Sequence, residues 1–362
     1  MAESTSDLAA YVQAILKDKV DTTSVTGEKE AVAFVVSKAD ALVAVEGRAT
    51  DVEGLFKLFV KSTGITHVNA LVEKLTADSN NATLKLRILA NVFNSTPVAN
   101  APLRFHTLLS IIKYAGSTDN LALVQSYFKD IDALATGFST DNLKALYLTI
   151  ADLLEKAHDE HAALLFLEKY LAIVPAADAA SAKDVAVRAA VLVVKSPIQS
   201  FVANVDLIHL PAVKALEGSN KIYDLLDIFS SKTLADYLKF EASSGAILKE
   251  HGIDAAAAAA NIRLLTLCSY PTGHDEIPFD DIVAKLQVAE ADIETWVVRA
   301  ITANLIEAKI NQLDRSVVIS RSLQRGVGLD NWKELHATLL RYKTNVGSLL
   351  DTIRRAQVSA TK

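Results

Sequence analysis

Cysteine is nearly absent from this 362-residue chain, which contains Cys268 alone. One cysteine cannot form a disulfide within the chain, and low cysteine usage favours a reducing compartment. We therefore expect a cytoplasmic protein. The Asn-X-Thr sequences at Asn81 and Asn94 then carry no glycan, because that modification belongs to secreted proteins.

Long hydrophobic runs are also missing, although 51% of the residues are hydrophobic and the mean hydropathy is +0.24. The longest run without a charged residue, 88–103, contains asparagines and prolines and is shorter than the ~20 apolar residues that span a bilayer. Residues 1–7 lack the basic and apolar regions of a secretion signal. The apolar excess points either to an alanine-rich helical core or to surfaces that a partner buries.

Catalytic motifs are missing as well. The sequence contains no HExxH zinc motif, no cysteine pair, no GxxxxGK[ST] phosphate loop and no GxSxG nucleophile turn. Gly326 and Gly328 make only a fragment of a phosphate loop. Cys268 lies in an apolar helical segment without a candidate base, which indicates a buried structural thiol. These absences predict a protein that is not an enzyme and has no cofactor.

One set of possible metal ligands stands out. Glu155, His158 and His161 have the spacing that places side chains on one helical face, and three such ligands suit zinc. The sequence offers no second Glu-x-x-His pair to complete a di-iron site. We favour a solvated turn between two scaffold helices, and we expect no bound metal.

The charge is uneven along the chain, whose net charge is −6. Residues 315–362 contain nine Lys or Arg and three Asp or Glu, so this segment carries +6 and the remainder carries −12. A basic C-terminal segment on an acidic body suits RNA or an acidic partner.

Apolar residues recur at helical spacing along most of the chain, and short loops rich in Gly, Ser, Thr, Asn and Asp separate these segments. The clearest unit is residues 140–175, where two helices flank a turn and Pro175 ends the second. Helix pairs of this length build solenoids, although the signature residues of the tetratricopeptide repeat are missing. We expect a mostly α protein of about two domains, in which residues 1–205 form a right-handed helical-repeat solenoid.

The periodicity changes between residues 275 and 321. Two helical patterns come first, at 279–286 and 293–301. The apolar period then drops to two at 305–310 and, after a turn-rich stretch, at 317–319. Two helices followed by a small antiparallel β-hairpin make a winged helix.

The second of these helices carries the wrong charge for a DNA reader. Such a helix needs basic and amide side chains, because phosphate contacts supply most of the non-specific affinity. Here the whole helix, which we expect to span residues 290–304, carries Glu290, Asp292 and Glu294 against Arg299 alone. We expect this surface to repel duplex DNA.

Two surfaces on and beside the hairpin are candidate sites. The outer edge of a hairpin offers unpaired backbone groups, so we expect residues 316–320 at or near an intersubunit contact. The nearby arginines are possible RNA contacts, but a solubilising rim beside a protein interface is the interpretation we favour. The expected interface residues are Val317, Val318 and Ile319, and the arginines are Arg315, Arg321 and Arg325.

A long amphipathic helix follows at residues 329–356. Seven large apolar residues recur at alternating spacings of three and four, which is a heptad seam. Burying each one fully is worth about 1.5–3 kcal/mol, so leaving the seam in water is unfavourable. We expect its first third to fold back onto the winged helix and the remainder to enter a bundle with helices of other subunits; packing wholly against its own solenoid is the alternative. The first third is Trp332, Leu335 and Leu339, and the bundle residues are Tyr342, Val346, Leu349, Leu350 and Ile353.

Several segments, taken in order, resemble one family. The layout of solenoid helices, winged helix and terminal helix is that of the PCI domain, which is found in the proteasome lid, the signalosome and an initiation factor. The segments resemble a PCI subunit of eukaryotic translation initiation factor three. They are residues 85–94, 210–218, 224–229 and 263–267, and the tail from Arg325 through Trp332 to Asn345.

The resemblance implies a non-catalytic scaffold subunit of a large cytoplasmic complex that binds the small ribosomal subunit and recruits messenger RNA. Its partners would be other PCI subunits, with no membrane, specific DNA or small-molecule substrate. It also divides the chain into a repeat region at 1–205, a PCI domain at 206–322 and a bundle helix at 329–356. The alternatives are a PCI subunit of the signalosome or proteasome lid, and an RNA-binding PCI adaptor in messenger export.

The missing motifs generate the first prediction. Purified protein should bind no stoichiometric metal and hydrolyse no nucleotide, because no nucleophile–base pair, metal cage or phosphate loop is visible in the sequence. Elemental analysis and a phosphate-release assay measure these properties. One equivalent of tightly held zinc that disappears in the His158→Ala and His161→Ala variants would contradict the prediction.

Overall fold

The structure is a computed structural model, and it describes residues 2–16, 28–45, 47–62, 65–270, 272–273, 276–323, 325 and 329–360. The chain divides into two compact units, Met1–Pro175 and Ala176–Lys362. Each unit is mostly helical, as the sequence predicts, and the strands lie in the second. No described helix has the length and apolar character needed to cross a membrane.

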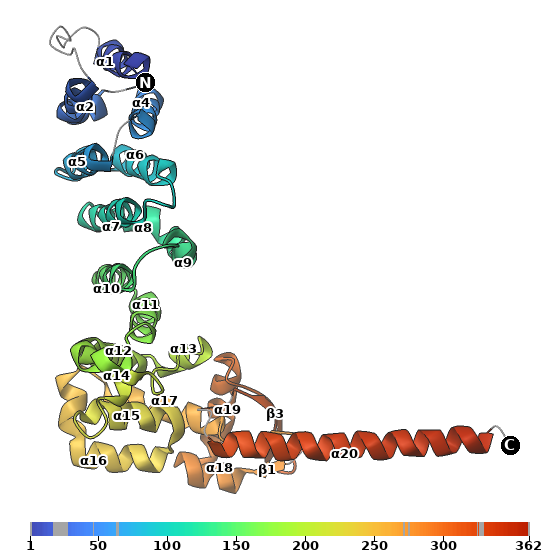
Figure 1. The fold of residues 1–362 in the computed structure, drawn as a ribbon. Coiled ribbons are helices and arrows are strands. Elements are labelled where there is room, and N and C mark those ends of the chain that lie inside the picture. Colours follow the sequence, from blue (N-terminus) through green and yellow to red (C-terminus); the bar gives the residue numbers. More distant parts are fainter. Residues whose placement is uncertain are drawn as a thin grey trace. The chain divides into compact units, whose positions relative to one another are not determined.

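The first unit is a succession of helices in which each packs on its neighbours in the chain (Figure 1). Apolar faces hold the stack together: α6 buries Leu86, Leu89 and Phe93 and packs against α4 and α7. Gly116 of α7 faces Leu153 of α10 so closely that any Cβ would clash. The elements are α1 (Ala2–Leu16), α2 (Glu28–Ser37), α3 (Ala39–Val43), α4 (Ala49–Ser62), α5 (Ile65–Leu75), α6 (Ala82–Ser95), α7 (Ala101–Ser117), α8 (Leu121–Gln125), η1 (Ser126–Asp130), α9 (Ile131–Leu134), α10 (Thr140–Lys156) and α11 (Glu160–Ala172).

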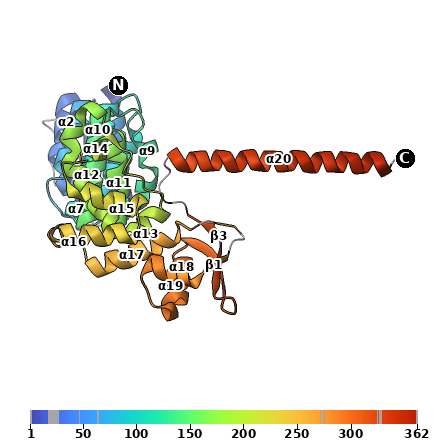
Figure 2. The same ribbon diagram turned by 90° about the horizontal axis from the view of Figure 1, so that it is seen from below.

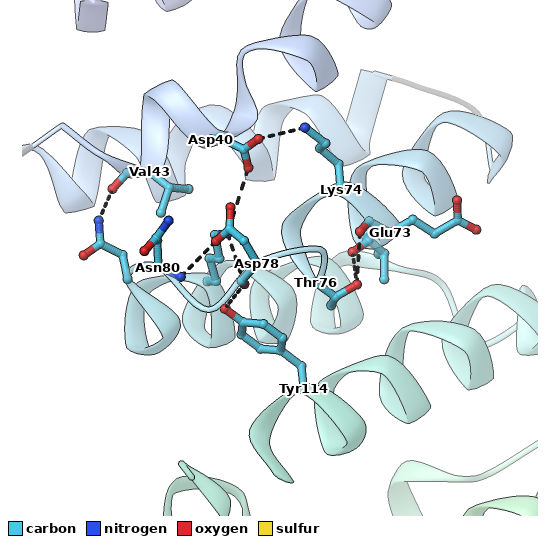
Figure 3. Close-up of polar contacts among 11 residues, drawn as sticks. Asp40, Val43, Glu73, Lys74, Thr76, Asp78, Asn80 and Tyr114 are labelled. Carbon is cyan, nitrogen blue, oxygen red and sulfur yellow. Dashed lines mark hydrogen bonds and ion pairs between the residues drawn. The ribbon is translucent and has the colours of Figure 1, made fainter. Parts of the chain in front are cut away.

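A cluster of polar side chains fastens the loop between α5 and α6 of this unit (Figure 3). Lys85 is only 1% exposed, and its Nζ lies 2.5 Å from Asp78 Oδ1 and 3.9 Å from Asp40 Oδ1. Lys74 pairs with the same Asp40 at 2.8 Å, and the Tyr114 hydroxyl donates to the Asp78 carbonyl at 2.9 Å. Side chains of α3, α5, α6 and α7 therefore converge on one loop.

The hydrogen bond from Lys85 lowers the pKa of the Asp78 carboxyl below its ordinary range. A carboxyl whose pKa is depressed by folding contributes stability that is fully present above its unfolded pKa and is lost as the pH falls through the folded value. The Asp78 contribution is therefore present at neutral pH and disappears only in strong acid.

The second unit begins with helices whose ends are capped by side chains. Asn220 accepts a hydrogen bond from the amide of Ile222, and Asp254 accepts one from the amide of Ala256. Caps of this kind satisfy amides that have no partner within the helix. The helical elements before the sheet are η2 (Ala176–Ala182), α12 (Lys183–Lys195), α13 (Pro197–Val202), α14 (Pro211–Lys214), α15 (Lys221–Ser231), α16 (Leu234–Glu250) and α17 (Ala255–Leu267).

A winged helix follows, as the change in periodicity predicts. Its elements are β1 (Glu276–Pro278), α18 (Phe279–Leu286), η3 (Glu290–Asp292), α19 (Ile293–Thr302), β2 (Ile306–Asn311) and β3 (Ser316–Ser322). The chain ends in α20 (Leu329–Ala360), a helix of 32 residues.

The sheet has three strands rather than the two of the predicted hairpin. Their order is β1-β3-β2, and both pairings are antiparallel. Val318 lies opposite Glu276 on one side and Lys309 on the other. The last strand in the sequence is therefore the central strand of the sheet, and β1 and β2 form its edges.

The cluster around Lys85 generates a prediction with two matched variants. Asp78→Asn leaves a buried ammonium with only the more distant Asp40, whereas Lys85→Met leaves a carboxylate that is 39% exposed and can be hydrated. We expect Asp78→Asn to destabilise the first unit by about 2 kcal/mol, below the ~3–5 kcal/mol of a fully buried pair, and Lys85→Met to cost less. Hydrogen exchange of the α6 amides reports the difference, and a larger cost for Lys85→Met would contradict the account.

Candidate functional site: the winged helix and the C-terminal helix

The helices and the sheet of the winged helix share one apolar core. Ile282 and Leu286 of α18, Val297 of α19 and Val317 of β3 are all fully buried. Figure 2 shows α18 and α19 beside β1 and β3. The hydroxyl of Tyr270, just before β1, donates a hydrogen bond to the carbonyl of Asp281 at 3.1 Å. Burial raises the pKa of Tyr270 to about 12. The shared core joins α18, α19 and the sheet into one unit, and the Tyr270 hydrogen bond ties the preceding segment to α18.

Three arginines of the winged helix have partners within the chain. Arg315 pairs with Glu290 at 2.6 Å, and Arg321 pairs with Glu307 at 3.1 Å. Arg299 lies over the Trp296 ring, 5.3 Å from its centroid. Arg315 and Arg321 stay well exposed, so RNA contact by them remains a proposal, but each already has a carboxylate partner.

The face that would approach a duplex is acidic. Glu290 and Asp292 are exposed at the start of α19, and Glu294 accepts a hydrogen bond from Gln312 of the wing turn. A helix N-terminus attracts phosphate through its amides, but carboxylates placed there oppose that attraction. Repulsion of duplex DNA by this surface stays a prediction, because Glu290 is already paired with Arg315.

The structure separates the three predicted interface residues of β3. Val317 and Ile319 are 0% and 1% exposed and belong to the core of the winged helix, so the prediction that they form a contact surface is wrong. Val318 points to the other face of the sheet and is half-buried. The reason is the additional strand: β1 and β2 pair with the two sides of β3, so β3 is not the edge that a two-stranded hairpin would provide.

Arg325 is also placed differently from the prediction. It is 8% exposed, and its guanidinium donates to the carbonyls of Ile228, Phe229 and Leu265 and to the hydroxyl of Ser269. A side chain held in this way cannot contact RNA, so that prediction is wrong for Arg325.

The apolar seam of α20 is exposed along the helix. Trp332, Leu335 and Leu339 are 59%, 48% and 58% exposed, so the prediction that they pack onto the winged helix is wrong. The helix is continuous from Leu329 to Ala360, so the apolar residues of the seam lie along one uninterrupted helix. The predicted bundle residues Tyr342, Val346, Leu349, Leu350 and Ile353 are exposed on the same helix.

Metal-binding and nucleophilic groups were the other candidates. Glu155 lies in the last turn of α10, His158 lies in the turn that follows, and His161 lies in α11. The described residues contain no group of three or more His, Cys, Asp or Glu that could hold a metal ion. Cys268 is buried, and its burial raises the pKa of the thiol to about 11. A thiol with this pKa is protonated at neutral pH and is a poor nucleophile.

Two features of the site were missed by sequence reasoning. Strand β1 contains one apolar residue, Ile277, between Glu276 and Pro278, which is too short for an alternating pattern. Leu313 is 96% exposed at the tip of the wing, where Asp314 and Asn311 close the turn with two hydrogen bonds. The turn-rich composition of residues 311–315 was the available signal for an exposed tip.

Comparison with known proteins gives similarities to the PCI domain and to subunits of an initiation factor. Residues 252–321 match the PCI domain family. The chain is 28% identical to eukaryotic translation initiation factor 3 subunit M of Dictyostelium discoideum, over 99% of this chain and 95% of the relative. It is 30% identical to the subunit M of Phaeosphaeria nodorum and 28% identical to that of Homo sapiens, over 76% and 79% of this chain.

The alignments extend far beyond the PCI domain itself. The chain spans 64% of the length of the Phaeosphaeria relative and 76% of the human one. The sequence segments that pointed to a PCI subunit of the initiation factor thus agree with relatives from fungi, animals and a slime mould. Residues 252–321 of the chain thus match the PCI domain family, and most of the chain is similar to subunits M of eukaryotic translation initiation factor 3.

Proposed function

We propose that this chain is a scaffold subunit of the eukaryotic translation initiation factor 3 complex in the cytoplasm and has no catalytic activity of its own. It assembles with other PCI-domain subunits and supports binding of the small ribosomal subunit and recruitment of messenger RNA. The names of its relatives and the PCI domain support this assignment. A PCI subunit of the signalosome or of the proteasome lid is the alternative, and no relative named above favours it.

The observation that carries the proposal is the exposed seam of α20. All described side chains of this helix are exposed, and nine of them are large and apolar. Monomeric proteins rarely expose a continuous apolar surface of this extent. Heptad spacing is the pattern with which helices pack side by side. The partner that suits this seam is therefore one or more helices of other subunits.

The outer face of the sheet is a second candidate contact. Val318 is the apolar centre of this face, and its cross-strand neighbours Glu276 and Lys309 are exposed and oppositely charged. Such a surface suits a protein partner, with an apolar contact flanked by one acidic and one basic group. An RNA-binding adaptor would need a continuous basic surface, but Glu276 flanks Val318 on this face, and Arg315 and Arg321 are paired with carboxylates.

The seam generates a prediction for assembly. Leu349→Asp with Ile353→Asp should abolish incorporation into the complex while the isolated chain keeps its melting temperature, because both side chains are exposed in the isolated chain. The matched control is Thr344→Asp with Ser348→Asp, which places the same charges on the opposite face of α20 and should incorporate normally.

Co-purification of co-expressed subunits measures incorporation, and calorimetry measures the melting temperature. A seam variant that unfolds the isolated chain, together with a wild-type helix that gives no intersubunit crosslinks, would show that the seam is internal core. Normal incorporation of the seam variant would refute docking through this surface. Co-purifying proteins that belong to the signalosome or to messenger export would favour the alternative assignments.

The two faces of β3 should respond differently to substitution. Ile319→Ala should destabilise the winged helix by about 2–5 kcal/mol, because it removes a buried side chain from the core. Val318→Gln should leave stability nearly unchanged and reduce co-assembly, because Val318 lies on the outer face. Calorimetry and co-purification on both variants test this, and normal assembly of Val318→Gln would count against the sheet as a contact.

A further inference from the structure

Arg325 is a buried cation whose hydrogen-bond partners are all uncharged. One terminal nitrogen, Nη2, lies 3.1 Å from the Ile228 carbonyl and 2.7 Å from the Phe229 carbonyl. The other, Nη1, lies 3.3 Å from the Leu265 carbonyl and 3.4 Å from the Ser269 hydroxyl. Its Nε has no partner among the described residues.

These partners lie at the C-terminal ends of two helices. Ile228 and Phe229 are in the last turn of α15, and Leu265 is in the last turn of α17. The last carbonyls of a helix form the negative end of the helix dipole, and those of Ile228 and Leu265 also accept the amides of Lys232 and Cys268. A guanidinium with several donors in one plane can serve two helix ends at once, which the single ammonium of lysine does less well.

The charge on Arg325 persists at neutral pH. Burial lowers the pKa of Arg325 to about 10, which is still well above neutrality. The nearby Cys268 thiol, with a pKa of about 11, is neutral there and adds no counter-charge. The helix ends are therefore the main electrostatic stabilisation of this buried cation.

Besides capping two helices, Arg325 is placed to restrain the chain that leads to α20. Two hydrogen bonds hold the chain just before it: the Ser322 hydroxyl donates to the Cys268 carbonyl at 3.4 Å, and the Leu323 amide donates to the Leu305 carbonyl at 2.9 Å. Arg325 is the last described residue before α20, which starts at Leu329. Four residues of chain reach at most about 14 Å, so an anchored Arg325 limits where α20 can begin.

We propose that Arg325 is a positioning residue that fixes the origin of α20 at the C-terminal ends of α15 and α17. The purpose of this anchor rests on the proposed function, because a helix that docks with other subunits gains from a fixed starting point. A short connection keeps the effective concentration of the second contact high once the first has formed. The anchor itself is a property of the isolated chain.

Distances between spin labels test the proposal in the isolated full-length chain. One label is placed at Lys309→Cys on β2 and the other at His336→Cys near the start of α20, both of which are exposed positions. Cys268 is buried with a raised pKa and stays unlabelled. The wild-type background should give a confined distance distribution, and Arg325→Gln should broaden it.

Three further variants make the result specific. Arg321→Gln removes a nearby arginine that is exposed and pairs with Glu307, and it should leave the distribution unchanged. An insertion of eight Gly and Ser residues after Gly328 keeps the Arg325 contacts and should widen the distribution of label-to-label distances by about 16 Å. Arg325→Lys keeps the charge but cannot bridge both helix ends equally well, and it should give an intermediate width.

Each outcome decides for or against the anchor. A wild-type distribution as broad as that of the insertion variant overturns it, and so does an Arg325→Gln distribution as narrow as the wild type. If circular dichroism shows that Arg325→Gln does not fold, Arg325→Lys decides, and a wild-type width in that variant overturns the bridging role. Because the measurement involves no partner, it stands apart from failure of the assembly predictions.

Discussion

The structure depends on the removal of apolar side chains from water, which is the main favourable contribution to folding. In the first unit α6 satisfies this requirement by burying Leu86, Leu89 and Phe93 and packing against α4 and α7. In the second unit the winged helix does so through one core that α18, α19 and β3 share. The described part of α20 is the exception, because its apolar seam is left exposed. The constraint that explains the compact units therefore also underlies the proposal that a partner covers this seam.

Buried charges add a second level of organisation to this packing. Lys85 joins Asp78 and Asp40 around the loop that leads into α6, and Arg325 joins the ends of α15 and α17. A buried cation is costly unless its donors are satisfied, so such residues tolerate few arrangements of the surrounding backbone. Apolar contacts hold helices together without a preferred direction, whereas these polar contacts fix particular loops and helix ends.

Periodicity in the sequence predicted the elements with long, regular patterns. The alternation around Ile306 and Ile310 identified β2, and the heptad spacing identified α20 as one continuous helix. Strand β1 was not predicted, because a strand of three residues is too short to show an alternating pattern. Without β1, the central strand β3 was taken for an edge strand. For that reason Val317 and Ile319 were predicted to lie on a contact surface, whereas both are buried in the complete sheet.

The environment of single side chains was harder to predict than the elements. Nothing in the sequence distinguishes Arg325, which is buried against helix ends, from Arg321, which is exposed beside Glu307. The difference depends on residues 56 to 97 positions earlier in the chain that fold back to meet the guanidinium. Spacing alone likewise could not say whether the first third of the α20 seam is covered.

The strand order has a consequence for the synthesis of the protein. Because β3 is the last strand to emerge and lies between the other two, neither β1 nor β2 has its partner until Ser322 has left the ribosome. Pairing of Glu276 with Val318 closes a loop of about 40 residues, and such non-local contacts form slowly. For that interval the apolar faces of α18 and α19 lack part of their cover, and transiently exposed apolar surface of this kind is prone to aggregation.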